Sequence, residues 1–249
     1  MTKETKNFPT EEVTLPSKGL LYQKGSELNK GTVEMKYMTA REEDILTNQN
    51  YIANGTVIDK LLKSLIVSDI DYNELLVGDK NAVMVAARIL GYGADYTFKY
   101  QGETHNIDLS KIKDKVIDES VIKEGKNEFE FILPTAKIPV TFKLLTHKDE
   151  RNIDRELKGL QKINKKDVKD LTTRLKHILL SVDGDYDTKT IREFVDTKFL
   201  ARDARELRNY IGKIQPSVDL TFDLEDAMGN IKSTEVPIGI EFFWPDAEL

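Results

Sequence analysis

Alternation of apolar and polar residues along the chain predicts several short β-strands. Residues 33–38 (Val-Glu-Met-Lys-Tyr-Met) alternate without exception, which is typical of a half-buried strand. Three further segments, 95–109, 129–145 and 218–244, each contain two strand-like runs joined by turn residues, and we expect each to form a β-hairpin. The return strand of the last hairpin is expected over residues 234–244.

Apolar residues at helical spacing predict helices between these hairpins. Thr39 followed by Glu42 is a capping-box pattern, so a helix is expected from residue 40 to about residue 48. Amphipathic helices are expected at 56–67 and 79–90, the second ended by Gly91 and Gly93. Residues 147–182 are expected to form a helical hairpin, and further helices are expected at 190–199 and 201–211, stopped by Gly212 and Pro216.

The second arm of the helical hairpin carries apolar residues in a 3-4-3-4 pattern that is typical of a coiled-coil seam. A short connection favours pairing of this seam with residues 153–160 of the same chain, and pairing with another copy is the alternative. The residues of the seam are Val168, Leu171, Leu175, Ile178 and Val182.

These elements together predict an α+β fold of three β-hairpins interleaved with helical blocks. Residues 1–12 are polar and are expected to form an N-terminal arm. Residues 13–249 are expected to form a single domain, because the third hairpin can return to the first two. Two lobes, 13–145 and 146–249, are the alternative.

Composition narrows the class of protein. The chain has 249 residues, 37 Lys plus Arg, 43 Asp plus Glu and a net charge of −6, and it has no Cys. The absence of Cys excludes disulfides, thiol nucleophiles and Cys-ligated metals. The net negative charge argues against bulk attraction to nucleic acid or an anionic membrane. No run reaches the ~18 apolar residues of a membrane span, so we expect a cytosolic protein without a membrane partner.

Motif searches give no support for catalysis or for a cofactor. The sequence contains no GxSxG, GxxxxGK[ST] or GxGxxG motif. His105, His147 and His177 lack metal-ligand spacing, so no metal is expected. Asp183, Asp185 and Asp187 begin like a calcium loop, but Thr188 and Phe194 occupy the positions that need Gly and Glu. We expect this acidic loop to cap the following helix.

Lysines gather around the turn of the helical hairpin. Acidic residues are interleaved with them, which favours a mixed solvated surface over a nucleic-acid site. The lysines are Lys158, Lys162, Lys165, Lys166 and Lys169, and the acidic neighbours are Asp154, Glu156, Asp167 and Asp170.

Two apolar segments near the chain ends stand out. Residues 15–22 (Leu-Pro-Ser-Lys-Gly-Leu-Leu-Tyr) contain a turn signal between apolar residues and predict an N-terminal hook. Residues 242–245 (Phe-Phe-Trp-Pro) place three adjacent aromatic residues on an expected strand, where they must face both ways. Either helices cover both faces, or one face is an aromatic docking edge for a partner.

Several segments in order resemble the T4-family baseplate hub assembly chaperones of contractile-tailed bacteriophages. The resemblance covers both ends and much of the first half of the chain, and the helical hairpin is its least specific part. It is carried by residues 15–22, 38–46, 55–62, 200–208 (Leu-Ala-Arg-Asp-Ala-Arg-Glu-Leu-Arg), 215–220 (Gln-Pro-Ser-Val-Asp-Leu), Pro237 and 242–245.

The resemblance implies a non-enzymatic factor that helps to assemble the baseplate hub in the host cell cytoplasm. Its implied partners are baseplate hub or tape-measure proteins. Many relatives carry CxxC-like pairs in the first and last hairpins, whereas residues 100–103 and 223–228 here contain no Cys, so no metal role is carried over. A permanent structural subunit of the virion tail baseplate is the alternative function, and an unrecognised enzyme is a third.

The candidate partner-binding residues come from the hook, the 200–208 segment and the aromatic segment. Those of the 200–208 segment are expected to form either a charged face or an internal ion-pair brace. The candidates are Leu15, Leu20, Leu21, Tyr22, Arg202, Asp203, Arg205, Arg208, Phe242, Phe243 and Trp244.

Overall fold

The computed structural model of the chain describes residues 9–100, 102–163, 169–225 and 231–243. Its helices are α1 (Ala40–Leu46), α2 (Gln49–Ala53), α3 (Val57–Leu65), α4 (Val77–Tyr92), α5 (His147–Ile163), α6 (Asp170–Ile178), α7 (Thr188–Thr197) and α8 (Ala201–Ile214). Its strands are β1 (Thr10–Thr14), β2 (Thr32–Lys36), β3 (Asp95–Tyr100), β4 (Glu103–Asp108), β5 (Phe129–Ile132), β6 (Pro139–Phe142), β7 (Leu179–Val182), β8 (Thr221–Glu225) and β9 (Ile231–Glu235).

The α+β class is confirmed, and the strands form four small antiparallel sheets. The three hairpins β3–β4, β5–β6 and β8–β9 lie where the sequence predicts them, but they share no sheet among the described residues. A fourth pair, β1–β2, joins Thr10 to Lys36 across the hook. Thr10–Glu12 therefore belong to a strand, which corrects the expectation of a polar arm as far as residue 12.

The predicted strand is confirmed as β2 but ends at Lys36, so that Tyr37 and Met38 lie outside it, and the capped helix at residue 40 is confirmed. In β2, Val33 and Met35 are buried while their neighbours are not. The Glu42 carboxylate accepts hydrogen bonds from the Thr39 backbone N–H (3.0 Å) and the Thr39 hydroxyl (2.6 Å). Helix α1 ends at Leu46, and α2 begins separately after Asn48, whose side chain caps it.

The prediction of a helical hairpin over residues 147–182 is only partly correct, because residues 179–182 form β7 and not a helix. The apolar spacing continues through Val182, but β6 offers an unpaired edge, and Val182 pairs with Val140 there. Leu171, expected in the seam, is 43% exposed, whereas Leu175 is buried. Helices α5 and α6 do pack on each other within one chain. Residues 164–168, with Val168, lie outside the described residues.

Three further boundaries differ from the sequence expectation. Gly91 lies inside α4, and Gly93, with φ +84°, follows the last helical residue. Helix α8 continues through Gly212 to Ile214. Residues 241–243 form a short 3₁₀ helix, η4, instead of the end of a strand, because β9 stops at Glu235.

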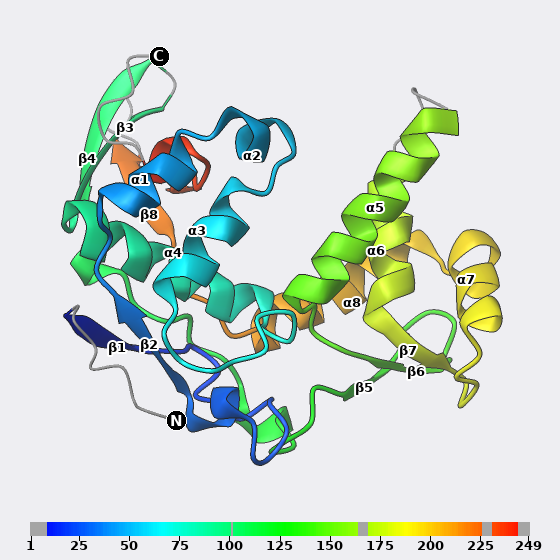
Figure 1. The fold of residues 1–249 in the computed structure, drawn as a ribbon. Coiled ribbons are helices and arrows are strands. Elements are labelled where there is room, and N and C mark those ends of the chain that lie inside the picture. The colour runs from blue at the N-terminus through cyan, green and yellow to red at the C-terminus, as the bar shows by residue number, and fades with distance from the viewer. Residues whose placement is uncertain (1–8, 101, 164–168, 226–230, 244–249) are drawn as a thin grey trace.

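The elements gather into two lobes (Figure 1). The first lobe (residues 9–126 and 217–243) holds α1–α4, β1–β4 and the β8–β9 hairpin. The second lobe (residues 127–216) holds β5–β7 and α5–α8. The third hairpin thus lies in the same lobe as β3–β4, while β5–β6 lies in the other lobe, and the chain crosses between the lobes twice. One continuous cluster of buried apolar side chains runs through both lobes.

No helix in the described ranges is long and apolar enough to cross a bilayer.

Candidate functional site

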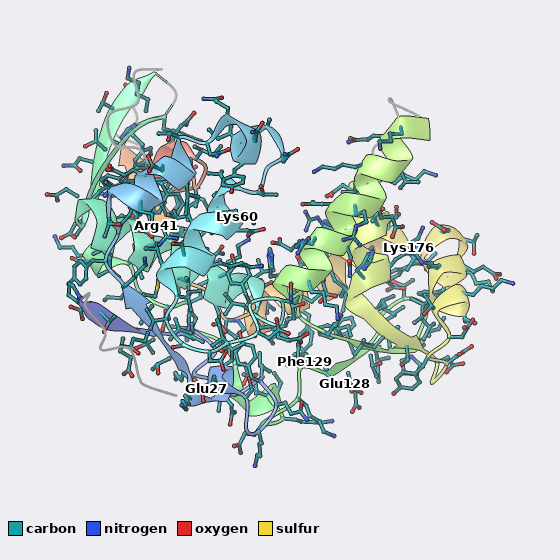
Figure 2. The ribbon with its side chains drawn as sticks, viewed as in Figure 1. Glu27, Arg41, Lys60, Glu128, Phe129 and Lys176 are labelled. Atoms are coloured by element: carbon teal, nitrogen blue, oxygen red, sulfur yellow. The ribbon has the colours of Figure 1, made fainter. Side chains whose placement is uncertain are left out.

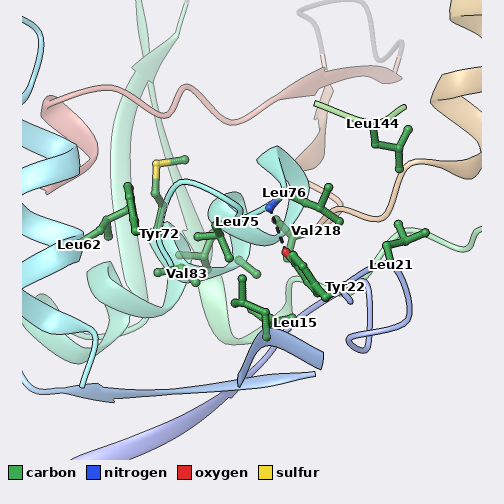
Figure 3. Close-up of a cluster of buried hydrophobic side chains, with 14 of the residues drawn as sticks. Leu15, Leu21, Tyr22, Leu62, Tyr72, Leu75, Leu76, Val83, Leu144 and Val218 are labelled. Atoms are coloured by element: carbon green, nitrogen blue, oxygen red, sulfur yellow. Dashed lines mark hydrogen bonds between the residues drawn. The ribbon is translucent and has the colours of Figure 1, made fainter. Parts of the chain in front are cut away.

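The hook is anchored on the first turn of α4 through Asp79. The Asp79 carboxylate accepts hydrogen bonds from the Ser17 backbone N–H (2.9 Å), the Ser17 hydroxyl (2.6 Å) and the Tyr22 hydroxyl (2.6 Å). The Tyr22 hydroxyl in turn accepts a bond from the Leu76 N–H (2.9 Å), as Figure 3 shows. Because a buried polar group without partners costs free energy, this network fixes the hook to α4.

Burial dominates the electrostatics of this network. It raises the pKa of the Asp79 carboxyl, and the hydrogen bonds from Ser17 and Tyr22 oppose the rise without cancelling it. Burial and the neighbouring Asp79 also raise the pKa of Tyr22. All three side chains are buried, so a substrate has no access to them and the network holds the fold together.

The backbone of the hook at Gly19 packs closely against the backbone at Asn29. Lys18 and Gly19 both adopt positive φ angles, of 51° and 78°. A Cβ on Gly19 would lie 2.4 Å from the carbonyl oxygen of Asn29. The Asn29 side chain donates to the Gly19 carbonyl oxygen at 2.9 Å, so the turn is held from both sides.

The C-terminal segments meet the same helix. A Cβ on Gly78 would lie 1.7 Å from the Pro216 carbonyl oxygen, so the 215–220 segment lies directly against the start of α4. Near the other end of α4, the ring of Phe242 packs edge-on against Tyr96, with 4.9 Å between ring centroids. We call this convergence of the hook, the 215–220 segment and η4 on α4 the α4 joint.

The α4 joint corrects the expectation that the hook and the aromatic segment present a docking surface. Leu15, Leu21 and Tyr22 are buried in the core, and Leu20 is half-buried (Figure 3). Phe242 and Phe243 are 0% exposed, which selects the alternative in which other elements cover the aromatic side chains. Trp244 lies outside the described residues.

The 200–208 segment divides into one buried anchor and three exposed cations. The Asp203 carboxylate accepts from the backbone N–H groups of Thr135 (2.7 Å) and Ala136 (2.9 Å), and so holds the β5–β6 turn. Burial works against ionisation of Asp203, but these bonds keep its pKa below the usual range. Asp203 therefore braces the fold through hydrogen bonds to backbone N–H groups and not through the expected ion pair. Arg202, Arg205 and Arg208 are exposed on α8.

A second polar cluster, the interlobe cluster, joins the lobes through Asp59, Tyr72, Lys80 and His147. Asp59 Oδ1 accepts from Lys80 Nζ (2.9 Å) and from the Tyr72 hydroxyl (3.1 Å). His147, the first residue of α5, lies 3.4 Å from Asp59 Oδ2 through Nε2 and 3.4 Å from Lys80 Nζ through Nδ1. Its ring packs edge-on against Tyr72 at 4.6 Å.

Histidine, lysine and carboxylate are acid–base groups, but Tyr72 and His147 are buried, and the side chains of Asp59 and Lys80 are only 24% and 14% exposed. Burial lowers the pKa of His147 to about 4. The positive charges of Lys80, Lys63 and Arg151 lower it further, whereas the negative charge of Asp59 raises it. The His147 side chain is buried, and the neighbouring cavity is lined by none of the four side chains of the interlobe cluster. The arrangement positions α5 against the first lobe.

The remaining histidines and the acidic loop lie elsewhere. His105 of β4 packs at a tilt against Phe98 of β3 and Phe222 of β8, and His177 lies 3.0 Å from Glu156. Across the ranges that the structure describes, no group of three or more acidic or histidine side chains could hold a metal ion. Asp187 caps α7 by accepting from the Thr190 N–H, as the sequence predicts for this loop.

Helix α5 carries a row of exposed basic side chains that the sequence analysis did not identify. Lys148, Arg151, Arg155, Lys158 and Lys162 recur every three or four residues and are all exposed, so they form one stripe along the helix. We call it the α5 basic stripe; α5 stands beside the gap between the two lobes (Figures 1 and 2). The sequence signal is a 3-4-3-4 spacing of cations, which the interleaved acidic residues of α5 obscure.

Comparison of the chain with protein-family models, with curated proteins and with solved structures finds no match.

Proposed function

We propose that this chain is a non-enzymatic bacteriophage assembly factor that binds baseplate hub subunits and promotes assembly of a contractile tail. The observation that carries the proposal is the α4 joint. Three segments of the family resemblance, 15–22, 215–220 and 242–243, lie far apart in the sequence and all pack against α4, the first two at its start and the third through η4. This common packing on one helix supports the resemblance.

Two more segments of the resemblance also contact each other. Helix α1 packs on α3, and Glu42 accepts a hydrogen bond from Ser64 at 2.7 Å. The residues that resemble the family are thus those on which the fold depends, which supports a shared architecture. The role in assembly, the hub or tape-measure partners and the host cytoplasm follow from the resemblance and form part of the proposal.

Among the sequence-derived candidates that the structure describes, Arg202, Arg205 and Arg208 are the exposed ones. Exposed arginines are common at protein interfaces, where they pair with carboxylates. We therefore assign them as candidate contacts for the hub.

The test is recovery of the tagged full chain from phage-infected cells before lysis, with identification of the bound proteins. Recovery of baseplate hub or tape-measure proteins is the expected result. Recovery of host enzymes or nucleic acid alone would contradict the proposal. A variant with Arg202, Arg205 and Arg208 changed to Gln tests the assigned contacts, and Lys189→Gln on α7 is the matched exposed control.

A permanent structural subunit of the hub is the competing function. Mass spectrometry of purified tails separates the two, because a structural subunit is present at fixed stoichiometry and an assembly factor is absent.

A further inference from the structure

The α5 basic stripe is a continuous cationic surface. Lys148 and Lys162, its first and last residues, are fourteen residues apart, or about 21 Å at 1.5 Å per residue. Two of the four acidic residues of α5 turn to other partners: Asp149 bonds to Lys143 and Thr146, and Glu156 bonds to Arg192 and His177. Asp154 is exposed at the edge of the stripe, one turn from Arg151 and Lys158.

The stripe is not neutralised by the chain itself. Within the described ranges, no carboxylate oxygen lies within 4.0 Å of any of its five cations. The protein has a net charge of −6, so a row of five cations without ion-pair partners gives this part of the surface the opposite charge to the protein as a whole. Such a surface favours encounter with an acidic partner.

The shape beside the stripe indicates the class of partner. A cavity of about 260 Å³ lies between α5 and the loop before α4, lined on one side by Lys148, Arg151 and Arg155 and on the other by Asp71 and Glu74. The two carboxylates of the loop are hydrogen-bond acceptors and call for donors, which a phosphate backbone does not supply. A protein segment can offer acidic groups to the stripe and donors to the loop.

Two further observations favour a protein. The face of α5 that carries the stripe has no aromatic side chain on which bases could stack. Gly159 lies between Arg155 and Lys162 on this face, is exposed, and has nothing within 4 Å of the place where a Cβ would be. Since Gly destabilises a helix interior relative to Ala and the described chain does not require it here, it leaves room for a backbone from outside.

We propose that the α5 basic stripe docks an acidic helical segment of a partner protein. Glutamates or aspartates at a 3-4-3-4 spacing on that segment would face the cations, and its backbone would approach α5 at Gly159. This inference stands apart from the proposed function, because its test needs no phage component.

The test measures binding of the full chain to a labelled 18-residue peptide with Glu at 3-4-3-4 spacing in an Ala and Gln background. A peptide of the same composition with Glu distributed around the helix is the control. We expect the patterned peptide to bind several-fold more tightly and its affinity to fall as salt rises. Equal binding of both peptides, or tighter binding of a 20-nucleotide single- or double-stranded DNA, would overturn the proposal.

Variants locate the site. Arg155→Gln with Lys158→Gln is expected to weaken binding of the patterned peptide about tenfold. Lys189→Gln with Lys213→Gln, at exposed positions on α7 and α8, should leave it unchanged. Gly159→Ala should weaken binding while the chain remains folded by circular dichroism. An effect of the control pair equal to that of the stripe pair would place the peptide elsewhere and refute the assignment.

Discussion

The Tyr22 hydroxyl donates a 2.6 Å hydrogen bond to the Asp79 carboxylate and accepts a 2.9 Å bond from the Leu76 backbone N–H. One side chain of the hook thereby satisfies two polar groups at the start of α4. The relationship ties residues 57 positions apart in the sequence. It makes the hook a structural part of the first lobe rather than an appendage.

Tyr22→Phe should lower the free energy of unfolding by about 1–3 kcal/mol, because it leaves the Leu76 N–H and one Asp79 oxygen without their partner in a buried site. Urea unfolding followed by circular dichroism measures the change. Tyr186→Phe, at an exposed tyrosine, is the control and should change stability by no more than about 0.5 kcal/mol. Equal stability of the two variants would refute the role assigned to the network.

Gly78→Ala and Gly212→Ala should have opposite effects, although both glycines lie in helices. A Cβ at residue 78 would overlap the Pro216 carbonyl oxygen, so we expect a loss of at least about 2 kcal/mol as the 215–220 segment is displaced. Residue 212 faces open space, so Ala should stabilise α8 by about 0.5–1 kcal/mol. The shift in urea midpoint of each variant checks the pair, and a tolerated Gly78→Ala would mean that the α4 joint is loosely packed.

Glu42 should make the chain sensitive to acid. Burial alone would raise the pKa of Glu42, but hydrogen bonds from Lys36, Thr39 and Ser64 outweigh it and hold the pKa at about 2, below the ordinary value of 4.5. A depressed carboxyl pKa contributes stability that is present above pH 4.5 and is lost as the pH falls toward 2.

Glu42→Gln tests this linkage. The difference in unfolding free energy between the original chain and the variant should be largest near neutral pH. It should shrink as the pH falls through that window, by at most about 3 kcal/mol. Glu12→Gln, at an exposed site on β1, is the control. A difference that stays constant with pH would contradict the depressed pKa.

Protonation of His147 should destabilise the chain between pH 6.5 and about 4, a higher range than that of Glu42. Its pKa is lowered from 6.5 to about 4, mainly by burial, so the unfolded chain binds the proton more readily between these values. Stability should therefore fall as the pH drops from 6.5 to 4, by at most about 3 kcal/mol.

His147→Gln removes the titrating group and should flatten this part of the pH profile. Urea unfolding at a series of pH values measures the slope. His105→Gln serves as the control and should keep the slope of the original chain. If His147→Gln keeps the slope as well, another group is responsible for it.

The sequence by itself determined the strands, helices and caps that depend only on residues close together in the chain. The alternation at residues 33–38 produces β2 because every second side chain of a strand faces the core. Thr39 and Glu42 start α1 through a bond within one helical turn. The loop at residues 183–187 caps α7 because Asp187 needs only a neighbouring N–H. Spacing along the chain encodes each of these.

Only the tertiary structure decided which surfaces are buried and which are free. Val182 became a strand residue because β6 offered an edge, and Phe243 became a core residue because η4 turned toward α4. The buried Asp79 and His147 depend on partners far away in the sequence. The cations of α5 recur at helical spacing in the sequence, but only the packing of α5 shows that their side chains are exposed while Glu156 pairs with Arg192.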